Sequence, residues 1–151
     1  MKKILLAVIA VMMVGFAGFS KASSDIAMAP IIEKSLVYIK MLEDEKDQEV
    51  VHVEYDIIRT TKDVYRSLQK GYTYGIVAYG DDRVKAMSLK VYRKNGNKWQ
   101  LVDSDTAGDE IAVVEVKPTT SGEYKFVIGV DSYNGSYRAA HYGVILFHEA
   151  P

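Results

Sequence analysis

The feature that most constrains this fold is an alternation of apolar and polar side chains with a period of two, which recurs between residues 49 and 148. In residues 123–130, for example, apolar side chains occupy every second position: Tyr124, Phe126, Ile128 and Val130. Such alternation is typical of strands with one buried and one solvated face. The chain therefore predicts a mostly β domain.

We predict eight strands, at residues 49–58, 63–68, 72–79, 85–93, 98–102, 110–117, 123–130 and 138–148. Turn signals separate several of them. Asn95-Gly96 and Asn134-Gly135 tolerate the positive φ that tight turns require, and Pro118 opens another turn cluster. Strands of this length between regular turns favour a β-sandwich or barrel, with no sign of a second domain.

A helical pattern precedes the strands, from Pro30 to about Asp44. Its apolar stripe has spacings of four, three and three, and consists of Ile32, Leu36, Ile39 and Leu42. We expect this stripe to be the buried face. We also expect the helix to cover an open end or edge of the sandwich, where it would protect unpaired backbone groups. Residues 23–29 are interpreted as a flexible start.

The first 22 residues have the three parts of a cleavable signal peptide: Lys2 and Lys3, an uncharged run to Phe19, and a small-residue exit ending at Ala22. A cut after Ala27 or Ala29 is an alternative. A retained anchor is disfavoured because the apolar run is shorter than the roughly 20 residues of a membrane-spanning helix. We expect a secreted or periplasmic protein without a stable membrane anchor.

Cleavage would change the charge. It removes three lysines and no acid, which leaves 16 basic and 20 acidic side chains and a net charge of −4. An acidic domain has no electrostatic reason to bind nucleic acid. The chain has no cysteine, so neither a lipid anchor on cysteine, a disulfide nor thiol catalysis is available. Packing, or a bound ion, must hold the fold together.

Several motifs occur in one order: Leu68-Gln-Lys-Gly-Tyr-Thr-Tyr74, Ala78-Tyr-Gly-Asp81, Leu89-Lys-Val-Tyr92, Asn95-Gly96 and Lys117-Pro-Thr-Thr-Ser-Gly-Glu-Tyr124. Over residues 48–149 this series resembles the bacterial pre-peptidase C-terminal domain. The resemblance implies an antiparallel, jelly-roll-like β-sandwich, here in a stand-alone exported form. One departure is Ala86-Met87-Ser88-Leu89, which stands where many members carry an Asp-Leu-Asp-Leu-like stretch.

An acidic segment is the candidate metal site. Asp103, Asp105 and Asp109 surround a glycine, and Asp81 and Asp82 in another loop could complete a shell for Ca²⁺, which requires six to eight oxygen ligands. The alternative, which we favour, is a solvated loop whose short acids accept hydrogen bonds from the backbone. No other cofactor is expected.

Aromatic side chains are the candidate ligand site. The chain has 11 tyrosines and a single tryptophan. Exposed rings can stack on a sugar or anchor a protein partner. Trp99, Tyr133 and Tyr137 are the predicted members of such a patch. The alternative is that these aromatics serve the strands and the core.

The histidines suggest no complete site. His52 and Glu54 share a strand face, whereas His141 and His148 lie on opposite faces of one strand. No third ligand accompanies them, so we interpret all three histidines as surface or hydrogen-bonded structural residues. No known catalytic motif is present either.

We therefore expect an exported, non-catalytic β-sandwich module that binds a carbohydrate, a cell-envelope component or a protein partner. One alternative is an inhibitor or accessory partner of a secreted hydrolase, because domains of the resembled family accompany such enzymes. Another is a small hydrolase whose unrecognised site includes His52 and Glu54.

Overall fold

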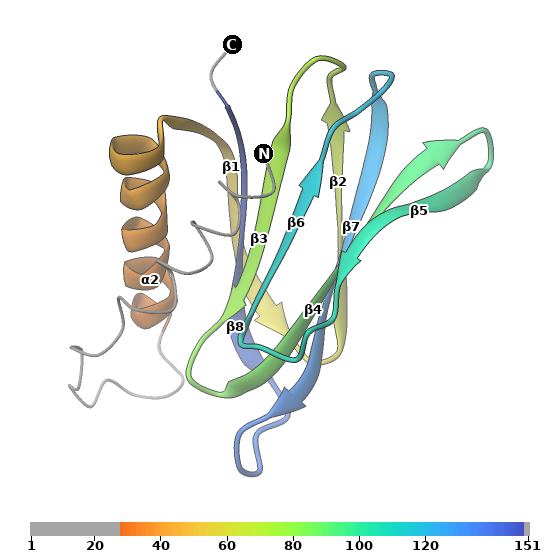
Figure 1. The fold of residues 1–151 in the computed structure, drawn as a ribbon. Helices are drawn as coiled ribbons and strands as arrows, with labels where there is room; N and C mark the ends of the chain where they lie inside the picture. The colour runs from red at the N-terminus through yellow and green to blue at the C-terminus, as the bar shows by residue number, and fades with distance from the viewer. Residues whose placement is uncertain (1–27, 150–151) are drawn as a thin grey trace.

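In the described part of the chain, eight antiparallel strands form two four-stranded sheets that pack face to face, and one helix lies beside them (Figure 1). The computed structural model describes residues 28–149, so the predicted signal peptide lies outside the described residues. The strands are β1 (Gln48–Ile58), β2 (Thr61–Leu68), β3 (Tyr74–Gly80), β4 (Val84–Asn95), β5 (Lys98–Asp105), β6 (Ile111–Val116), β7 (Gly122–Tyr133) and β8 (Ala140–Glu149).

The order of the strands defines a jelly roll. Sheet A has the order β1-β8-β3-β6 and sheet B the order β2-β7-β4-β5. Strands that follow one another along the chain therefore rarely pair, and most connections pass from one sheet to the other. This is the arrangement of two Greek keys in a double-sheet sandwich. The predicted fold class is confirmed.

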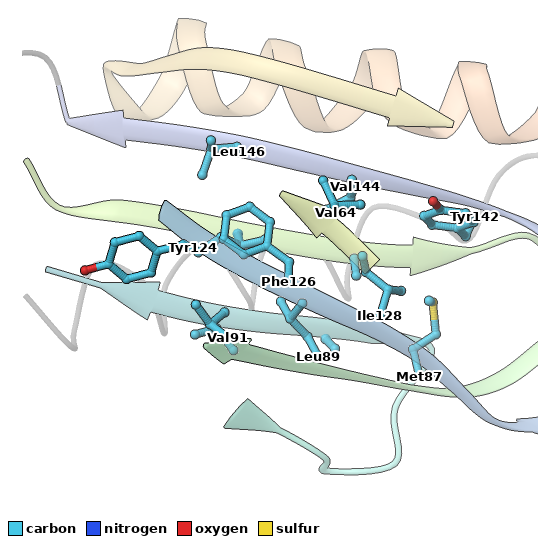
Figure 2. Close-up of a cluster of buried hydrophobic side chains, with 14 of the residues drawn as sticks. Val64, Met87, Leu89, Val91, Tyr124, Phe126, Ile128, Tyr142, Val144 and Leu146 are labelled. Atoms are coloured by element: carbon cyan, nitrogen blue, oxygen red, sulfur yellow. The ribbon is translucent and has the colours of Figure 1, made fainter. Parts of the chain in front are cut away.

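The core lies between the two sheets (Figure 2). Sheet B contributes every second residue of β4 and β7, and sheet A does the same from β8. Fully buried members include Leu89, Phe126, Ile128 and Tyr142. Because each large apolar side chain stabilises the fold by about 1.5–3 kcal/mol when buried, these rows define which face of each strand points inward.

A second hydrophobic layer lies on the other side of sheet A. Helix α2 (Ala29–Lys40) continues into a π-helical turn, η1 (Met41–Glu45), and packs against side chains that point away from the sandwich core. The sheet residues of this layer are Val77, Tyr79, Val113, Ile145 and Phe147. The expected position at an end or edge was wrong: the helix covers the outer face of sheet A, because that face is as apolar as the inner one.

Only half of the expected apolar stripe packs on sheet A: Leu42 is buried and Ile39 is partly buried there. Ile31, Ser35, Tyr38 and Leu42 are buried against the sheet. Ile32 and Leu36, from the predicted stripe, are 38% and 59% exposed. The face that packs contains polar members because Lys34 donates a hydrogen bond to the Gly80 carbonyl at 3.1 Å and the Ser35 hydroxyl contacts the Tyr79 hydroxyl.

Two glycines leave room for the aromatic rings under the helix. A Cβ at Gly143 would lie 2.5 Å from Cζ of Tyr79, and one at Gly75 would lie 2.1 Å from Cζ of Phe147. The Tyr79 ring also meets Tyr38 edge to face, with centroids 4.9 Å apart. Residues without side chains on β3 and β8 thus allow large rings to lie flat between sheet and helix.

The predicted strands agree with the structure except at their ends. The main difference is β5, which runs to Asp105 and thus into the segment interpreted as an acidic loop. The backbone of residues 103–105 continues to pair with β4, where Val91 faces Asp103 and Leu89 faces Asp105. Within residues 28–149, no helix has the length and apolar character needed to cross a membrane.

Candidate functional site

The outer face of sheet B is the candidate site. Because residues paired across antiparallel strands share a face, the register places one row across all four strands: Tyr65 on β2, Lys125 on β7, Tyr92 on β4 and Leu101 on β5. Trp99 lies in the adjacent row, paired with Lys94. Tyr65 and Leu101 are 47% and 52% exposed, so this row faces solvent.

Aromatic rings from the two edge strands of sheet B meet above its middle strands. The centroids of Tyr65 and Trp99 are 5.7 Å apart, with the ring planes inclined by 58°. The Lys125 ammonium lies 5.2 Å from the centroid of Tyr92 and 5.3 Å from that of Trp99. Such cation–π contacts contribute about 0.5–1 kcal/mol each at exposed sites. They hold the Trp99 ring over the sheet.

Two ion pairs lie on this face. Lys94 pairs with Glu123 at 2.7 Å, and Lys125 pairs with Asp63 at 3.7 Å. We call Tyr65, Tyr92, Trp99, Leu101, Lys94 and Lys125 the aromatic face. It combines the exposed Tyr65 ring and the partly buried rings of Tyr92 and Trp99 with polar groups that can donate or accept hydrogen bonds.

The three aromatics predicted from the sequence do not form one patch. Trp99 pairs with Lys94 near one end of β4, whereas Tyr133 pairs with Val84 at the other end. Ten residues of strand separate the two positions, which is roughly 30 Å at about 3.3 Å per residue. Trp99 belongs to the aromatic face, and Tyr65 and Tyr92 are the aromatic members that the sequence analysis missed.

Tyr133 and Tyr137 have other surroundings. The Tyr133 hydroxyl donates to the carbonyls of Ile58 at 3.0 Å and Arg59 at 2.9 Å, and its ring packs against the core. Tyr133 therefore ties β7 to the β1–β2 turn. Tyr137 lies in the β7–β8 loop, where its amide donates to the Asn134 carbonyl at 3.4 Å. For Tyr133, the structural alternative describes the contacts better than the binding patch.

The five candidate metal ligands are not brought together either. Among residues 28–149, no three histidine, aspartate or glutamate side chains form a group that could hold a metal ion. Asp105 accepts hydrogen bonds from the amides of Ala107 at 3.0 Å and Val113 at 2.9 Å. Asp103 accepts one from Ser104. Asp103 and Asp105 thus accept hydrogen bonds from backbone amides, which is the alternative to a metal site that the sequence analysis favoured. Asp82 and Asp109 are exposed.

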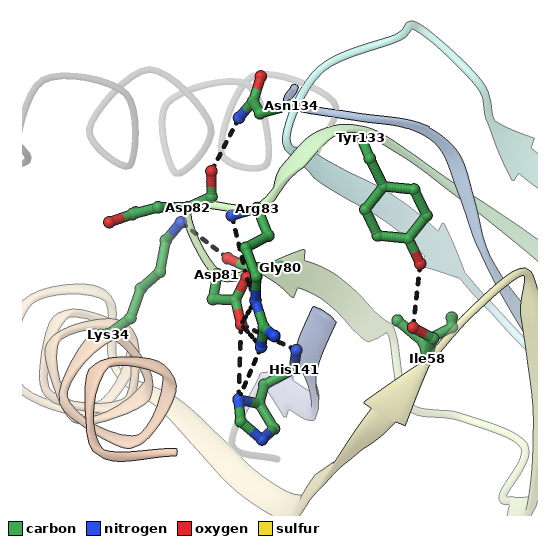
Figure 3. Close-up of polar contacts among 9 residues, drawn as sticks. All are labelled: Lys34, Ile58, Gly80, Asp81, Asp82, Arg83, Tyr133, Asn134 and His141. Atoms are coloured by element: carbon green, nitrogen blue, oxygen red, sulfur yellow. Dashed lines mark hydrogen bonds and ion pairs between the residues drawn. The ribbon is translucent and has the colours of Figure 1, made fainter. Parts of the chain in front are cut away.

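Asp81 instead belongs to a buried cluster that the sequence analysis did not foresee (Figure 3). Its carboxylate accepts hydrogen bonds from Nε of Arg83 at 3.1 Å and from the backbone amide of His141 at 2.8 Å. Arg83 also donates to Nδ1 of His141 at 3.0 Å. All three residues are less than one-tenth exposed. The cluster joins the β3–β4 loop to the start of β8, so its role is to fix that end of sheet A.

A second polar cluster closes the open side of the sandwich between β1 and β2. Nη2 of Arg66 lies 3.1 Å from Nδ1 of His52 and 3.4 Å from Oε2 of Glu54. The other oxygen of Glu54 accepts a hydrogen bond from the buried Tyr142 hydroxyl at 3.1 Å. Burial, and then the Arg66 guanidinium, lower the pKa of His52, against an opposing effect of Glu54. These groups satisfy one another and bridge the two sheets.

The predicted placement of the other two histidines is confirmed. His148 pairs with Tyr74 on the inner face of sheet A, whereas His141, seven residues earlier on β8, lies on the outer face of that sheet. His148 is in contact with an aromatic ring, since its centroid lies 4.7 Å from that of Tyr72. Both histidines are hydrogen-bonded, as expected for structural residues.

Comparison with known proteins adds little to this geometry. No family model matches the sequence, and no curated protein matches it significantly, so the resemblance to the pre-peptidase C-terminal domain stays a prediction. Among solved structures, the chain is similar to the Yersinia pseudotuberculosis-derived mitogen YPM, with 15% identity and a TM-score of 0.46 over 66% of this chain and 85% of the mitogen. It is also similar to TmCBM61, solved in complex with beta-1,4-galactotriose, with 18% identity and a TM-score of 0.34 over 70% of this chain and 85% of the other. At these values neither likeness bears on function.

Proposed function

We propose that this protein is a non-catalytic binding module whose aromatic face binds a carbohydrate. The observation that carries the proposal is the Tyr65–Trp99 pair on the solvent side of sheet B, with its centroids 5.7 Å apart. Trp and Tyr rings provide a large contact area with few rotatable bonds to immobilise. The exposed Tyr65 ring and the partly exposed Trp99 ring, which lysine contacts hold in place, are arranged for a ligand before the ligand binds.

The chemistry of the face fits a sugar. A pyranose ring has a surface of C–H groups, which the electron-rich face of an aromatic ring attracts. Its rim carries hydroxyl groups, each of which donates and accepts hydrogen bonds. Asp63 and Glu123 can accept from those hydroxyls, and Lys94 and Lys125 can donate to them. Lys94 and Lys125 are each paired with a carboxylate, which supports a neutral glycan over nucleic acid.

Trp99 makes the proposal directly testable because it is the only tryptophan in the chain. Titration of the purified protein with neutral oligosaccharides, chosen from a glycan array, should change the intensity or wavelength of Trp99 fluorescence. Tyr65→Ala and Trp99→Ala should each weaken binding by at least about tenfold, which corresponds to about 1.4 kcal/mol and is expected of a hot-spot residue. Binding by Trp99→Ala is followed by calorimetry.

Tyr137→Ala is the matched control, since Tyr137 is 36% exposed but lies away from the aromatic face. It should bind as the unmodified protein does. The proposal is wrong if no glycan binds at high protein concentration, or if a glycan binds equally well to all three variants.

The remaining functional statements stay predictions. The export signal and the resemblance to the pre-peptidase C-terminal domain would place such a module outside the cytoplasm, where cell-envelope polysaccharides and secreted hydrolases occur. Affinity capture from the culture medium separates these partners. A hydrolase that is retained by Tyr137→Ala but lost with Trp99→Ala would assign the aromatic face to a protein partner instead.

A further inference from the structure

Helix α2 exposes apolar side chains on the side that faces away from sheet A. Ile32, Leu36 and Val37 are 38%, 59% and 47% exposed. The opposite side of the helix is fully used, because Ile31, Ser35, Tyr38 and Leu42 are buried beneath it. Clusters of exposed apolar side chains in a soluble domain commonly mark an interaction site.

The charged residues of this exposed side have a two-fold arrangement. At 100° per residue, Glu33 and Lys40 are seven residues apart and lie within about 20° of the same line along the helix. Leu36 and Val37 stand at mid-height between them, one on each side of that line. A two-fold axis through this midpoint would place Glu33 of one helix opposite Lys40 of a second, antiparallel copy. It would also place Leu36 opposite Leu36 of the second copy, and Val37 opposite Val37.

We propose that two copies of this chain associate through antiparallel α2 helices, centred between Leu36 and Val37. The pairing covers the exposed apolar side chains and forms two equivalent Glu33–Lys40 ion pairs between copies. Antiparallel helices also place opposite ends of their dipoles side by side. The 3.5 Å contact of Lys40 with Asp44 within one helix does not compete strongly, because both side chains are well exposed to water.

The first test is the mass of the purified full chain in solution, measured by analytical ultracentrifugation over a concentration series. The expected result is twice the mass of one chain at high concentration. Leu36→Lys should remain at the mass of one chain throughout. Ile57→Lys is the matched control, because Ile57 is 53% exposed on β1 but lies outside the helix. It should still form dimers.

The second test uses charge reversal. Glu33→Lys and Lys40→Glu should each raise the dimer dissociation constant by about tenfold, because each turns two attractive pairs into repulsive ones. The double variant should recover the original constant, and so should an equal mixture of the two single variants, in which opposite charges again face each other. Far-UV circular dichroism verifies that each variant is folded.

The third test takes advantage of the absence of cysteine in this chain. Leu36→Cys chains under mild oxidation should form a disulfide dimer faster than Ile57→Cys chains, because the proposed axis puts each Leu36 opposite Leu36 of the second copy. The proposal is overturned if the unmodified chain has the mass of one chain at every concentration. This holds whatever keeps the helices apart, residues 1–27 included. It is also overturned if dimers persist in Leu36→Lys, or if the mixed charge variants fail to associate.

Discussion

Gly143 tests whether helix α2 packs on sheet A through the Tyr79 ring. Gly143 pairs with Tyr79 across β8 and β3. A methyl group at this position would lie 2.5 Å from both Cζ and the hydroxyl oxygen of Tyr79. The ring cannot move away freely, since it is fully buried and held by Tyr38 and Ser35 of the helix. Gly143→Ala should therefore push the helix away from the sheet.

The magnitude follows from two opposing effects. Adding a methyl group to a packed site costs about 1–3 kcal/mol. Replacing glycine also restricts the unfolded chain, which stabilises the folded state by about 0.4–1 kcal/mol. Gly122→Ala serves as the control, because a Cβ at Gly122 meets nothing within 4 Å. Both variants share the unfolded-state effect, so the difference between them isolates the steric cost, about 1–3 kcal/mol.

The assay is urea unfolding followed by far-UV circular dichroism. Gly143→Ala should have a free energy of unfolding about 1–3 kcal/mol lower than that of Gly122→Ala. When both alanine variants also carry Tyr79→Leu, most of this difference should disappear, because the smaller leucine side chain leaves space for the methyl group. Equal stability of the two alanine variants would refute the packing of Tyr79 between sheet and helix.

Three further predictions concern the polar groups. Folding lowers the pKa of His52 below its ordinary value of 6.5, so protonation favours the unfolded chain. The free energy of unfolding should therefore fall as the pH drops below 6.5. His52→Gln should make this free energy less dependent on pH, as measured by urea unfolding at a series of pH values. Asp81→Asn should destabilise the fold by about 3–5 kcal/mol, because it removes the buried carboxylate that pairs with Arg83. The exposed neighbour Asp82 can be changed to Asn with little effect on the melting temperature. Asp105→Ala should lower the free energy of unfolding by about 1–3 kcal/mol, because two hydrogen bonds from backbone amides are lost. The unmodified protein should melt at the same temperature with Ca²⁺ as with EDTA. A melting temperature that rises with Ca²⁺, and no longer rises in Asp105→Ala, would instead establish a metal site.

The strands β4 and β7 of sheet B could be predicted because each has one strongly apolar face. Phe126, Ile128 and Leu89 reveal their orientation through neighbours two residues away. The end of β5 was harder to predict. Its residues are mostly exposed, and they are held in the sheet by backbone pairing with β4 rather than by a buried side-chain row.

The buried face of the helix could not be predicted from apolar spacing alone. Ile31 and Ile32 are adjacent, so either could point inward, and Leu36 lies beside Ser35 in the same way. The structure selects Ile31 and Ser35 because the sheet offers Tyr79, whose hydroxyl needs a polar partner. A hydrophobicity pattern contains no information about that partner.

The candidate site shows the same limit. Alternation on β2 already places Tyr65 on the solvent side, opposite Val64. Its proximity to Trp99, 34 residues later, depends on the strand order of sheet B, which puts the two rings on opposite edges of one sheet. The cluster of Asp81, Arg83 and His141 likewise exists only because β3 and β8 are neighbours.

The order of the layers has a consequence for how this protein would act on a polymer. Helix α2 lies outside sheet A, and the aromatic face lies outside sheet B, so the two surfaces point in opposite directions. Two copies joined back to back through their helices would present their aromatic faces outward, too far apart to grip one short oligosaccharide together. Such a pair would bridge separate glycan chains, and its binding to a dense polysaccharide surface would gain from bivalency while its binding to a soluble fragment would not.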